Sequence, residues 1–242
     1  MTRGHPDWGL YPSLAALSVY EISGEQAARL GSPVNMFRDG LVCFMDDFRH
    51  GLGAWTDASL NGGAVKLVAT PAPPHSPFAL QLDIPATASA QAKATTTIPY
   101  PPTNTLGIQI VAQTGGTPYV FLVEADIYTG TRLIYAGFRL VQAGVWLGMA
   151  EGGHALITPT LADPLAVAGR WGLFQVVVDL SSESYARARS NTGMVVPTLG
   201  VINSVDDTSA PRVELALRAF VSGTPAAFTI TAAAVIVTYG EP

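Results

Sequence analysis

The sequence predicts an all-β protein, an antiparallel sandwich or a barrel, that follows an N-terminal arm containing one short helix. From Leu41 onward, apolar residues recur with a period of two or in short runs of strand length. Turn-forming residues, mainly Gly, Pro, Asn and Asp, separate nearly all of these segments. Many short strands with almost no helical pattern are typical of a sandwich or a barrel.

The segment Tyr119–Gln142 gives the clearest signal and predicts a hairpin with its turn at residues 128–131. Because strand side chains alternate, Phe121 and Ile127 belong to one face of the first strand, and Glu124 and Asp126 to the other. The other strands are expected at residues 41–48, 64–70, 78–84, 93–98, 106–112, 145–150, 154–158, 173–180, 184–190, 193–197, 212–221 and 226–239.

Residues 41–242 are predicted to form one sandwich domain, because the proline-rich stretches within them are short enough to be loops. Residues 1–40 are predicted to be an anchoring arm. Its helix, near residues 24–30, begins after the capping box at Ser23–Gln26 and ends at Gly31. The arm either lies on its own domain or docks on a neighbouring chain. Its expected partner-binding residues are Trp8, Tyr11, Leu14, Leu17 and Tyr20.

The chain has few charges: 13% of its residues are charged and 48% are hydrophobic. Such a surface is either covered by neighbouring subunits or simply that of a β-protein rich in Ala, Thr and Gly. The net charge of −5 argues against nucleic-acid binding, which needs a concentrated basic face.

The single cysteine, Cys43, lies in an apolar run and is expected to be a buried, inert thiol. No disulfide framework is predicted. The N-terminus has no continuous apolar region, so no secretory signal is expected, and no apolar run is long enough to predict a membrane span.

Both ends of the β-domain resemble a known family. Phe44–Phe48, followed by Gly51, Leu52 and Trp55, resembles the "DDF…GL..W" first strand of concanavalin-like and laminin-G-like modules, and Ala234–Thr238 resembles their last strand. The resemblance implies an antiparallel jelly-roll β-sandwich, concanavalin-like and related to carbohydrate-binding modules. The layout of a short arm before a sandwich is similar to structural proteins of tailed-bacteriophage particles.

In many such modules an acidic residue before the last strand helps to hold calcium, but this chain has Ala232–Ala234 there. Asp46 and Asp47 alone cannot supply the six or more oxygen ligands that calcium needs. The four histidines, His5, His50, His75 and His154, show no metal-ligand spacing. No metal and no cofactor are predicted.

The alternating residues Glu124, Asp126 and Tyr128 resemble the catalytic strand of concanavalin-like β-glucanases. The resemblance implies that Glu124 matches the nucleophile and Asp126 the helper carboxylate. Tyr128 occupies the place of the acid/base glutamate, and a phenol is far too weak an acid for that role. The protein is therefore predicted not to be an enzyme.

Four aromatic residues are candidates for stacking on sugar rings: Trp55, Trp146, Trp171 and Tyr119. Alternation also predicts that Tyr185, Arg187 and Arg189 share one strand face as a small basic strip, either a subunit contact or a solvated face.

The leading hypothesis is a non-enzymatic structural protein of a phage virion, a capsid decoration, fibre or tail component, whose arm anchors a displayed sandwich. Its expected partners are other virion proteins, further copies of itself as a homo-oligomer, and a surface glycan, with no nucleic acid and no membrane. One alternative is a carbohydrate-binding module for host or glycan attachment. A second alternative is a degenerate concanavalin-like glycoside hydrolase.

Overall fold

The computed structural model describes residues 41–70, 76–100, 103–116, 119–141, 144–147, 155–156, 165, 168–190, 193–195, 202–221 and 226–240. The predicted arm, residues 1–40, lies outside these residues together with its helix and its five apolar partner-binding residues. Within the described part, no helix has the length and apolar character needed to cross a membrane.

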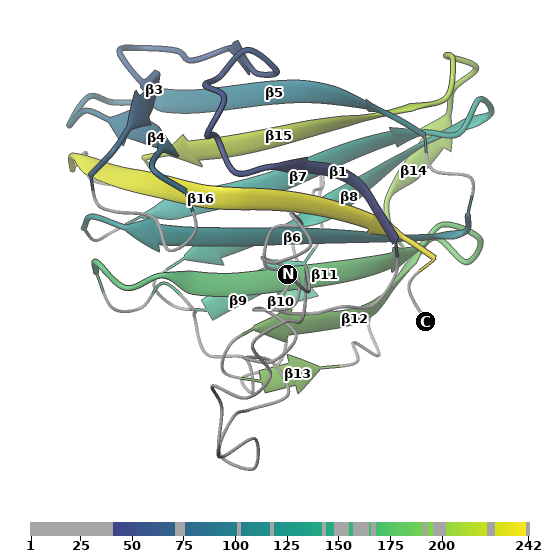
Figure 1. Cartoon of the computed structure of the whole chain (residues 1–242). Coiled ribbons are helices and arrows are strands. Elements are labelled where there is room, and N and C mark those ends of the chain that lie inside the picture. The colour runs from purple at the N-terminus through teal and green to yellow at the C-terminus, as the bar shows by residue number, and fades with distance from the viewer. Residues whose placement is uncertain are drawn as a thin grey trace, which may run out of the picture. The chain divides into compact units, whose positions relative to one another are not determined.

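The described strands form two antiparallel sheets of eight strands each (Figure 1). Sheet A has the order β13 (Gly193–Val195), β12 (Ser184–Ser190), β11 (Gly172–Asp179), β6 (Thr105–Thr114), β16 (Phe228–Tyr239), β4 (Ala79–Ile84) and β3 (Ala64–Val68), with β1 (Leu41–Asp46) paired to β16. Sheet B has the order β10 (Ala155–Leu156), β9 (Gly144–Leu147), β8 (Arg132–Val141), β7 (Val120–Tyr128), β15 (Arg212–Phe220), β5 (Gln91–Pro99) and β2 (Thr56–Asp57), with β14 (Ser204–Asp206) paired to β8. The predicted all-β antiparallel sandwich is confirmed, and the barrel is excluded because the sheets are separate.

The core lies between the sheets and is built from the inward side chains of both. In the β7–β8 hairpin, Phe121, Val123, Ala125 and Ile127 are fully buried, and Phe138 of β8 packs on Phe174 of β11 with ring centroids 4.4 Å apart. The outward residues Glu124, Asp126 and Tyr128 are only partly buried. The faces that alternation predicts for this hairpin are therefore confirmed.

The turn of this hairpin lies where the sequence predicts it. The Thr129 N–H donates to the Arg132 carbonyl over 2.9 Å, and the Thr129 hydroxyl oxygen accepts the Arg132 N–H over 3.0 Å. Gly130 has φ = +95°, in the left-handed region that glycine adopts without strain. The chain then reverses and fixes the register in which Asp126 lies opposite Tyr135.

Strand β1 ends at Asp46, two residues earlier than predicted. The Asp46 carboxylate accepts the backbone N–H of Phe48 over 2.7 Å and bends the chain, and Phe48 takes a left-handed φ of +61°. Strands β2 and β14 were not predicted. They span only two and three residues, too short to show a period in the sequence.

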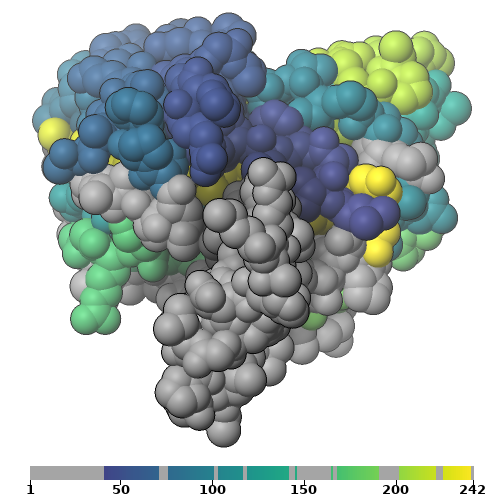
Figure 2. All heavy atoms as spheres, viewed as in Figure 1, coloured from purple at the N-terminus to yellow at the C-terminus, as the bar shows by residue number. Residues whose placement is uncertain are grey.

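Strand β1 pairs only with β16 among the described strands, and it lies on the surface (Figure 2). Leu41 and Val42 are 63% and 45% exposed. Cys43 is exposed too, so the prediction of a buried thiol is wrong. A strand at the edge of a sheet has a neighbouring strand on one side only, so its residues are less covered than those of a central strand. Partial desolvation still raises the pKa of the Cys43 thiol, whose Sγ contacts the Val237 carbonyl oxygen at 3.4 Å.

A β-bulge changes the faces of β12. The pairing of β11 with β12 shifts register between Val177 and Val178, so that Tyr185 lies opposite Val178 and Arg187 opposite Val177. Tyr185 consequently points into the core. The prediction that Tyr185 shares a face with Arg187 and Arg189 is wrong, because a bulge interrupts the alternation on which it was based. Arg187 and Arg189, which follow the bulge, still alternate with the core residue Ala188.

Candidate functional site

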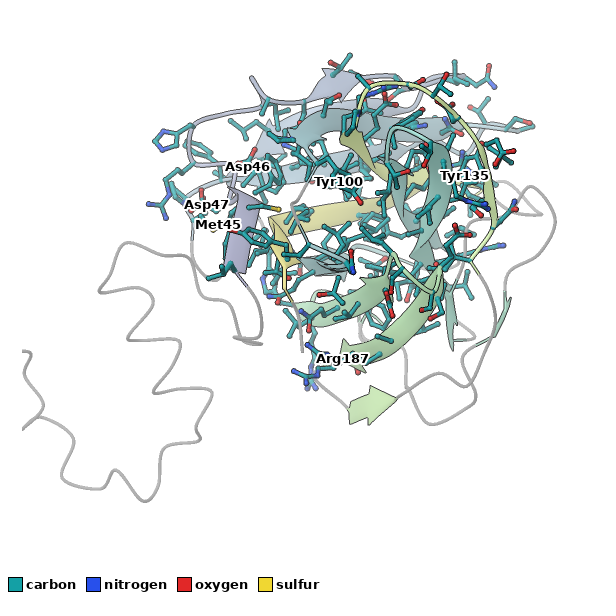
Figure 3. All side chains as sticks on the ribbon, turned by 90° about the vertical axis from the view of Figure 1, so that its right-hand side faces the viewer. Met45, Asp46, Asp47, Tyr100, Tyr135 and Arg187 are labelled. Atoms are coloured by element: carbon teal, nitrogen blue, oxygen red, sulfur yellow. The ribbon has the colours of Figure 1, made fainter. Side chains whose placement is uncertain are left out.

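The outward surface of sheet B carries charged side chains from strands that are distant in sequence. Alternation places one or more charged residues on the outer side of each of the four central strands, β5, β15, β7 and β8. We call this surface the charged face and define it by Lys93, Glu124, Asp126, Tyr135, Arg139, Glu214, Arg218 and Phe220. Figure 3 shows Tyr135 on the side of the sandwich away from Asp46 and Asp47.

Register arranges the charged face in rows that cross the strands. The cationic row runs from Lys93 through Arg218 and Leu122 to Arg139. The next row holds Ala216, Glu124 and Gly137. The acidic row follows, with Glu214, Asp126 and Tyr135.

Glu124 is the centre of the charged face. Its side chain is 12% exposed, and its two carboxylate oxygens lie 3.4 Å from Arg218 Nε and 3.7 Å from Lys93 Nζ. The residues beside it in its own row are Ala216, whose side chain is a methyl group, and Gly137, which has no side chain. Glu124 is therefore an oriented and largely buried carboxylate, held by two cations and flanked in its row by two small residues.

Gly137 is fixed from the other sheet. Its N–H donates to the Tyr185 hydroxyl oxygen over 3.0 Å, and the Tyr185 hydroxyl donates to the Gly137 carbonyl oxygen over 2.7 Å. Gly137 also has φ = +145°, which a residue with a side chain rarely adopts. The phenol of β12 thus holds the backbone of β8 opposite Glu124, a role that the sequence did not reveal.

Asp126 lies between two other carboxylates. Burial raises its pKa to about 6, and the negative charges of Glu124 and Glu214 add to the rise, while Lys93 opposes it. The group therefore changes charge close to neutral pH. Its neighbour along β7, Tyr128, has its ring 3.7 Å below the Arg212 guanidinium, and burial raises the pKa of its phenol above the usual range.

The same residues bear on hydrolysis. A retaining glycosidase needs a carboxyl group that donates a proton to the leaving oxygen. The resemblance puts Tyr128 at that position, and its raised pKa makes it a still weaker acid than a free phenol. The carboxyl group beside it on β7 is Asp126, with its pKa of about 6. Glu214, across the row from Asp126, accepts the Arg212 Nε–H over 2.7 Å and is tied to that cation.

Two of the predicted sugar-stacking residues are in the core. Trp55 is 8% exposed; its ring contacts Phe44 and Phe48, and its Nε1–H donates to Asp46 over 2.8 Å. Tyr119 is 2% exposed and belongs to the same core. Neither ring is available for stacking, because the sandwich buries it.

The other two aromatic candidates lie elsewhere. Trp171 is partly exposed and directly precedes β11 of sheet A, so it is not on the charged face. The backbone of Trp146 in β9 pairs with Arg139, at the end of the cationic row, and its side chain lies outside the described residues.

Sequence reasoning found Glu124 and Asp126 but missed Lys93, Arg139 and Arg218 as their neighbours. Lys93 is the single charge of β5, whereas β8 also contains Arg132, and β15 also contains Arg212 and Glu214. A charge at an outward position of a central strand is unusual enough to mark such residues as candidates. Their proximity to Glu124 depended on the strand order.

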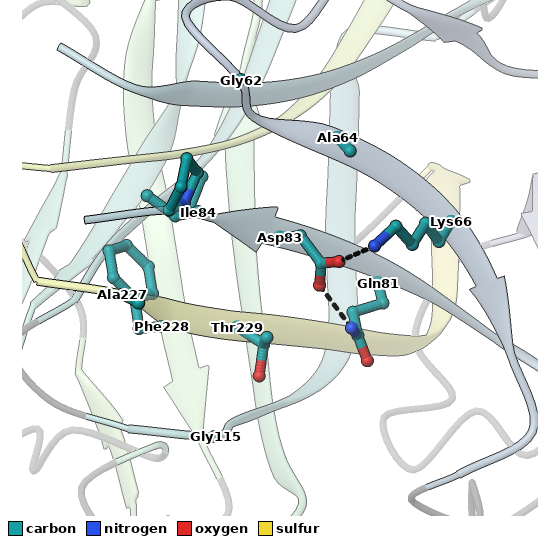
Figure 4. Close-up of a pocket in the computed structure, with 11 residues that line it drawn as sticks. Gly62, Ala64, Lys66, Gln81, Asp83, Ile84, Gly115, Ala227, Phe228 and Thr229 are labelled. Carbon is teal, nitrogen blue, oxygen red and sulfur yellow. Dashed lines mark hydrogen bonds and ion pairs between the residues drawn. The ribbon is translucent and has the colours of Figure 1, made fainter. Parts of the chain in front are cut away.

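A pocket of about 600 Å³ opens at the β3–β4 end of sheet A (Figure 4). Asp83 accepts hydrogen bonds from both Lys66 and Gln81. Ile84, Pro85 and Phe228 form an apolar part of the lining. Lys66 and Asp83 satisfy one another, so this pocket offers a ligand fewer uncommitted charges than the charged face does.

Asp46 and Asp47, considered for calcium in the sequence, are engaged in local contacts. Asp46 binds the Phe48 N–H and the Trp55 Nε1–H, and Asp47 forms an ion pair with Arg49. Within the described residues, no group of three or more His, Cys, Asp or Glu side chains gathers as metal ligands.

No family model matches the sequence, and no curated protein matches it. Several solved structures share its fold. One, from work on endo-acting O-glycanases that the human gut microbiota express to initiate mucin breakdown, has a TM-score of 0.52 at 10% identity, covering 81% of this chain and 98% of that one. A carbohydrate esterase of the Shiga toxin-encoding bacteriophage phi24B has a TM-score of 0.51 at 9% identity, covering 82% and 98%.

Peanut lectin, with a nine-residue peptide, has a TM-score of 0.46 at 10% identity, covering 81% of this chain and 95% of that one. For the two structures with TM-scores of 0.52 and 0.51, identities this low show the fold alone.

Proposed function

We propose that the protein binds carbohydrate through the charged face of sheet B and does not cleave it. The observation that carries this proposal is the setting of Glu124. Its carboxylate is held by Lys93 and Arg218 between the small residues Ala216 and Gly137, and 12% of its side chain is exposed on this face. Sugar hydroxyls donate well to such an oriented carboxylate.

Aromatic rings on the same face add to the support. Tyr135 lies in the row next to that of Glu124, and Phe220 lies beyond the cationic row on β15. Rings of this kind give sugars an apolar surface for stacking. Trp146 stays a proposed stacking residue, because its backbone continues the cationic row.

The comparisons support the proposal at the level of fold. The two structures with TM-scores above 0.5 come from work on an O-glycanase and from a carbohydrate esterase, so this sandwich fold occurs among proteins that act on carbohydrates. The proposed lack of catalysis rests on Tyr128, which stands where the resemblance puts the proton donor and whose ring stacks on Arg212.

A glycan array tests the proposal with the full chain and two variants. Glu124→Gln is expected to weaken binding of neutral glycans about ten- to a hundredfold, since a hydrogen bond to a charged group contributes about 1.5–3 kcal/mol. Asp206→Asn changes a 96% exposed carboxylate of β14 and is expected to bind as the wild type does. An array on which the wild-type chain binds no glycan would overturn the proposal. Glucanase activity that Glu124→Gln removes would overturn its non-catalytic part.

A structural role in a phage virion is a second proposal, and one surface feature favours it. Leu41, Val42 and Cys43 form an exposed, largely apolar edge directly after residues 1–40. An exposed apolar strand edge is suited to contacts between chains. The test is whether the protein co-purifies with phage particles and assembles through this edge; a chain that remains monomeric and free of particles would contradict it.

A further inference from the structure

The cationic row collects three positive side chains on one line across sheet B. Lys93, Arg218 and Arg139 are in register on β5, β15 and β8, with Leu122 of β7 between the two arginines. The side chains of Lys93 and Arg218 are only 28% and 29% exposed. Three partly desolvated cations repel one another unless anions balance them.

Among the described carboxylates, Glu124 alone forms ion pairs with this row, and Asp126 feels the charge of Lys93 without pairing with it. Glu124 lies near Lys93 and Arg218, at 3.7 and 3.4 Å. Arg139 has no carboxylate partner among the described residues, and its buried Nε–H has no hydrogen-bond acceptor there. Burial and the nearby charge of Arg218 lower the pKa of Arg139. Arg139 is therefore the cation of this row whose charge no ion pair among the described residues balances.

Phe220 brings the two arginines together. The Cζ atom of Arg218 lies 5.2 Å from the centroid of the Phe220 ring, and that of Arg139 lies 5.8 Å from it. A ring within about 6 Å of a guanidinium attracts and orients it. Two guanidinium groups fixed on one ring can donate paired hydrogen bonds to a flat or tetrahedral anion.

We propose that the cationic row recognises a negatively charged sugar, one carrying a carboxylate or a sulfate ester, within the glycan bound at the charged face. This inference rests on the proposed function and specifies its ligand class. The anionic group binds beside Arg139 and Arg218, while neutral hydroxyls of the same glycan meet Glu124. The acidic row fixes this orientation, because Asp126 and Glu214 repel an anion placed on their side of Glu124.

The rest of the protein favours an acidic glycan over a nucleic acid as the source of the anion. The chain has a net charge of −5, and the row that contains Asp126 and Glu214 lies one position beyond Glu124. A long nucleic-acid backbone on this face would bring its phosphates close to these carboxylates, and the like charges would repel one another. A single anionic sugar needs only the cationic row.

Matched polysaccharide pairs test the proposal by isothermal titration calorimetry on the full chain. The pairs are a polygalacturonate with its carboxyl-reduced form, and a sulfated galactan without uronic acid with its desulfated form. The acidic member of at least one pair is expected to bind about ten- to a hundredfold more tightly, and added salt is expected to reduce that preference. The pair that responds identifies the source of the anion.

Variants connect the preference to the row. Arg139→Gln is expected to remove most of the preference, because it weakens binding of the acidic member far more than binding of the neutral member. Arg139→Lys, which keeps the charge and is the safer variant for folding, is expected to retain part of it. Arg170→Gln alters an exposed arginine outside the charged face and is expected to keep the full preference.

Three results would overturn the inference. Equal binding of both members of each pair, with neutral glycans still lost in Glu124→Gln, would reject the cationic row and leave the proposed function standing. Binding of no member would reject both. Tighter binding of a single-stranded oligonucleotide than of any acidic glycan, lost in Arg139→Gln, would assign the row to nucleic acid.

Discussion

Asp126 shows at the scale of one residue how position alters chemistry. The ordinary pKa of an aspartate is 3.8, and burial, with the charges of Glu124 and Glu214, raises the pKa of Asp126 to about 6 in the folded chain. The folded protein therefore holds this proton more tightly than the unfolded chain. Stability from this group is greatest at low pH, falls as pH rises from about 4 to about 6, and stays constant above that range.

Asp126→Asn removes the loss of stability that ionisation of Asp126 causes at high pH, since the amide is uncharged like the protonated acid. The variant is expected to be more stable than the wild type at pH 8 by an amount on the order of 1–3 kcal/mol, with a smaller difference at pH 4.5. Urea denaturation at pH 8 and at pH 4.5 measures this difference in stability, with Asp206→Asn as the exposed control. A difference between variant and wild type that is the same at both pH values would contradict the raised pKa of Asp126.

Tyr185 joins the sheets through one hydroxyl. Tyr185→Phe leaves the N–H and the carbonyl of Gly137 without this partner in a buried place. The free energy of unfolding is expected to fall by about 1–3 kcal/mol, since an unsatisfied buried polar group costs that much. The control is Tyr135→Phe, on the outer face of β8, the strand that contains Gly137, and it is expected to change stability little. Equal losses of unfolding free energy in Tyr185→Phe and Tyr135→Phe would contradict a stabilising role for the hydrogen bonds between Tyr185 and Gly137.

At the scale of elements, the turn after β1 explains the aspartates of the "DDF…GL..W" motif. Asp46 accepts the Phe48 N–H and the Trp55 Nε1–H, and so ties the end of β1 to a core tryptophan. Asp47 instead pairs with Arg49, whose side chain is 50% exposed. The motif therefore stabilises the fold at the place where β1 ends.

Asp46→Ala is expected to reduce the free energy of unfolding by about 1–3 kcal/mol, because it leaves two donors unsatisfied. Asp47→Ala removes a pair with a half-exposed arginine and is expected to cost about 1 kcal/mol or less. Thermal denaturation of both variants compares them directly. A larger loss in Asp47→Ala than in Asp46→Ala would show that the turn depends on the second aspartate.

The elements also show where local patterns fail. Alternation predicted both faces of β7 and β8 correctly, because those strands are regular. In β12 the bulge between Tyr185 and Arg187 adds one residue, and every face after it is reversed. A bulge depends on the partner strand, so the sequence of β12 alone does not reveal it.

At the scale of the whole molecule, every described strand pairs within residues 41–240. Deleting residues 1–40 is therefore expected to leave a folded sandwich with the far-ultraviolet circular dichroism of a β-protein. If the arm anchors an assembly, the truncated chain is also expected to be smaller than the full chain by light scattering. A truncated chain that assembles as the full chain does would reject the anchoring role.

The sequence by itself determined the fold class, most strand positions, the main hairpin and the outward placement of Glu124 and Asp126. These follow from a period of two and from turn residues, which are local properties. The tertiary structure decided which distant residues meet. Strand β15 lies between β7 and β5, and only this order brings Arg218 and Lys93 to Glu124.

The same distinction accounts for the aromatic residues. The local sequence around a tryptophan in a turn does not show whether its ring faces solvent or the core. The burial of Trp55 was therefore known only from its ring contacts with Phe44 and Phe48 in the structure. Burial depends on the second sheet and on the path of the chain between strands. Local periodicity gives a side chain its direction, and the packing of the two layers determines what it meets there.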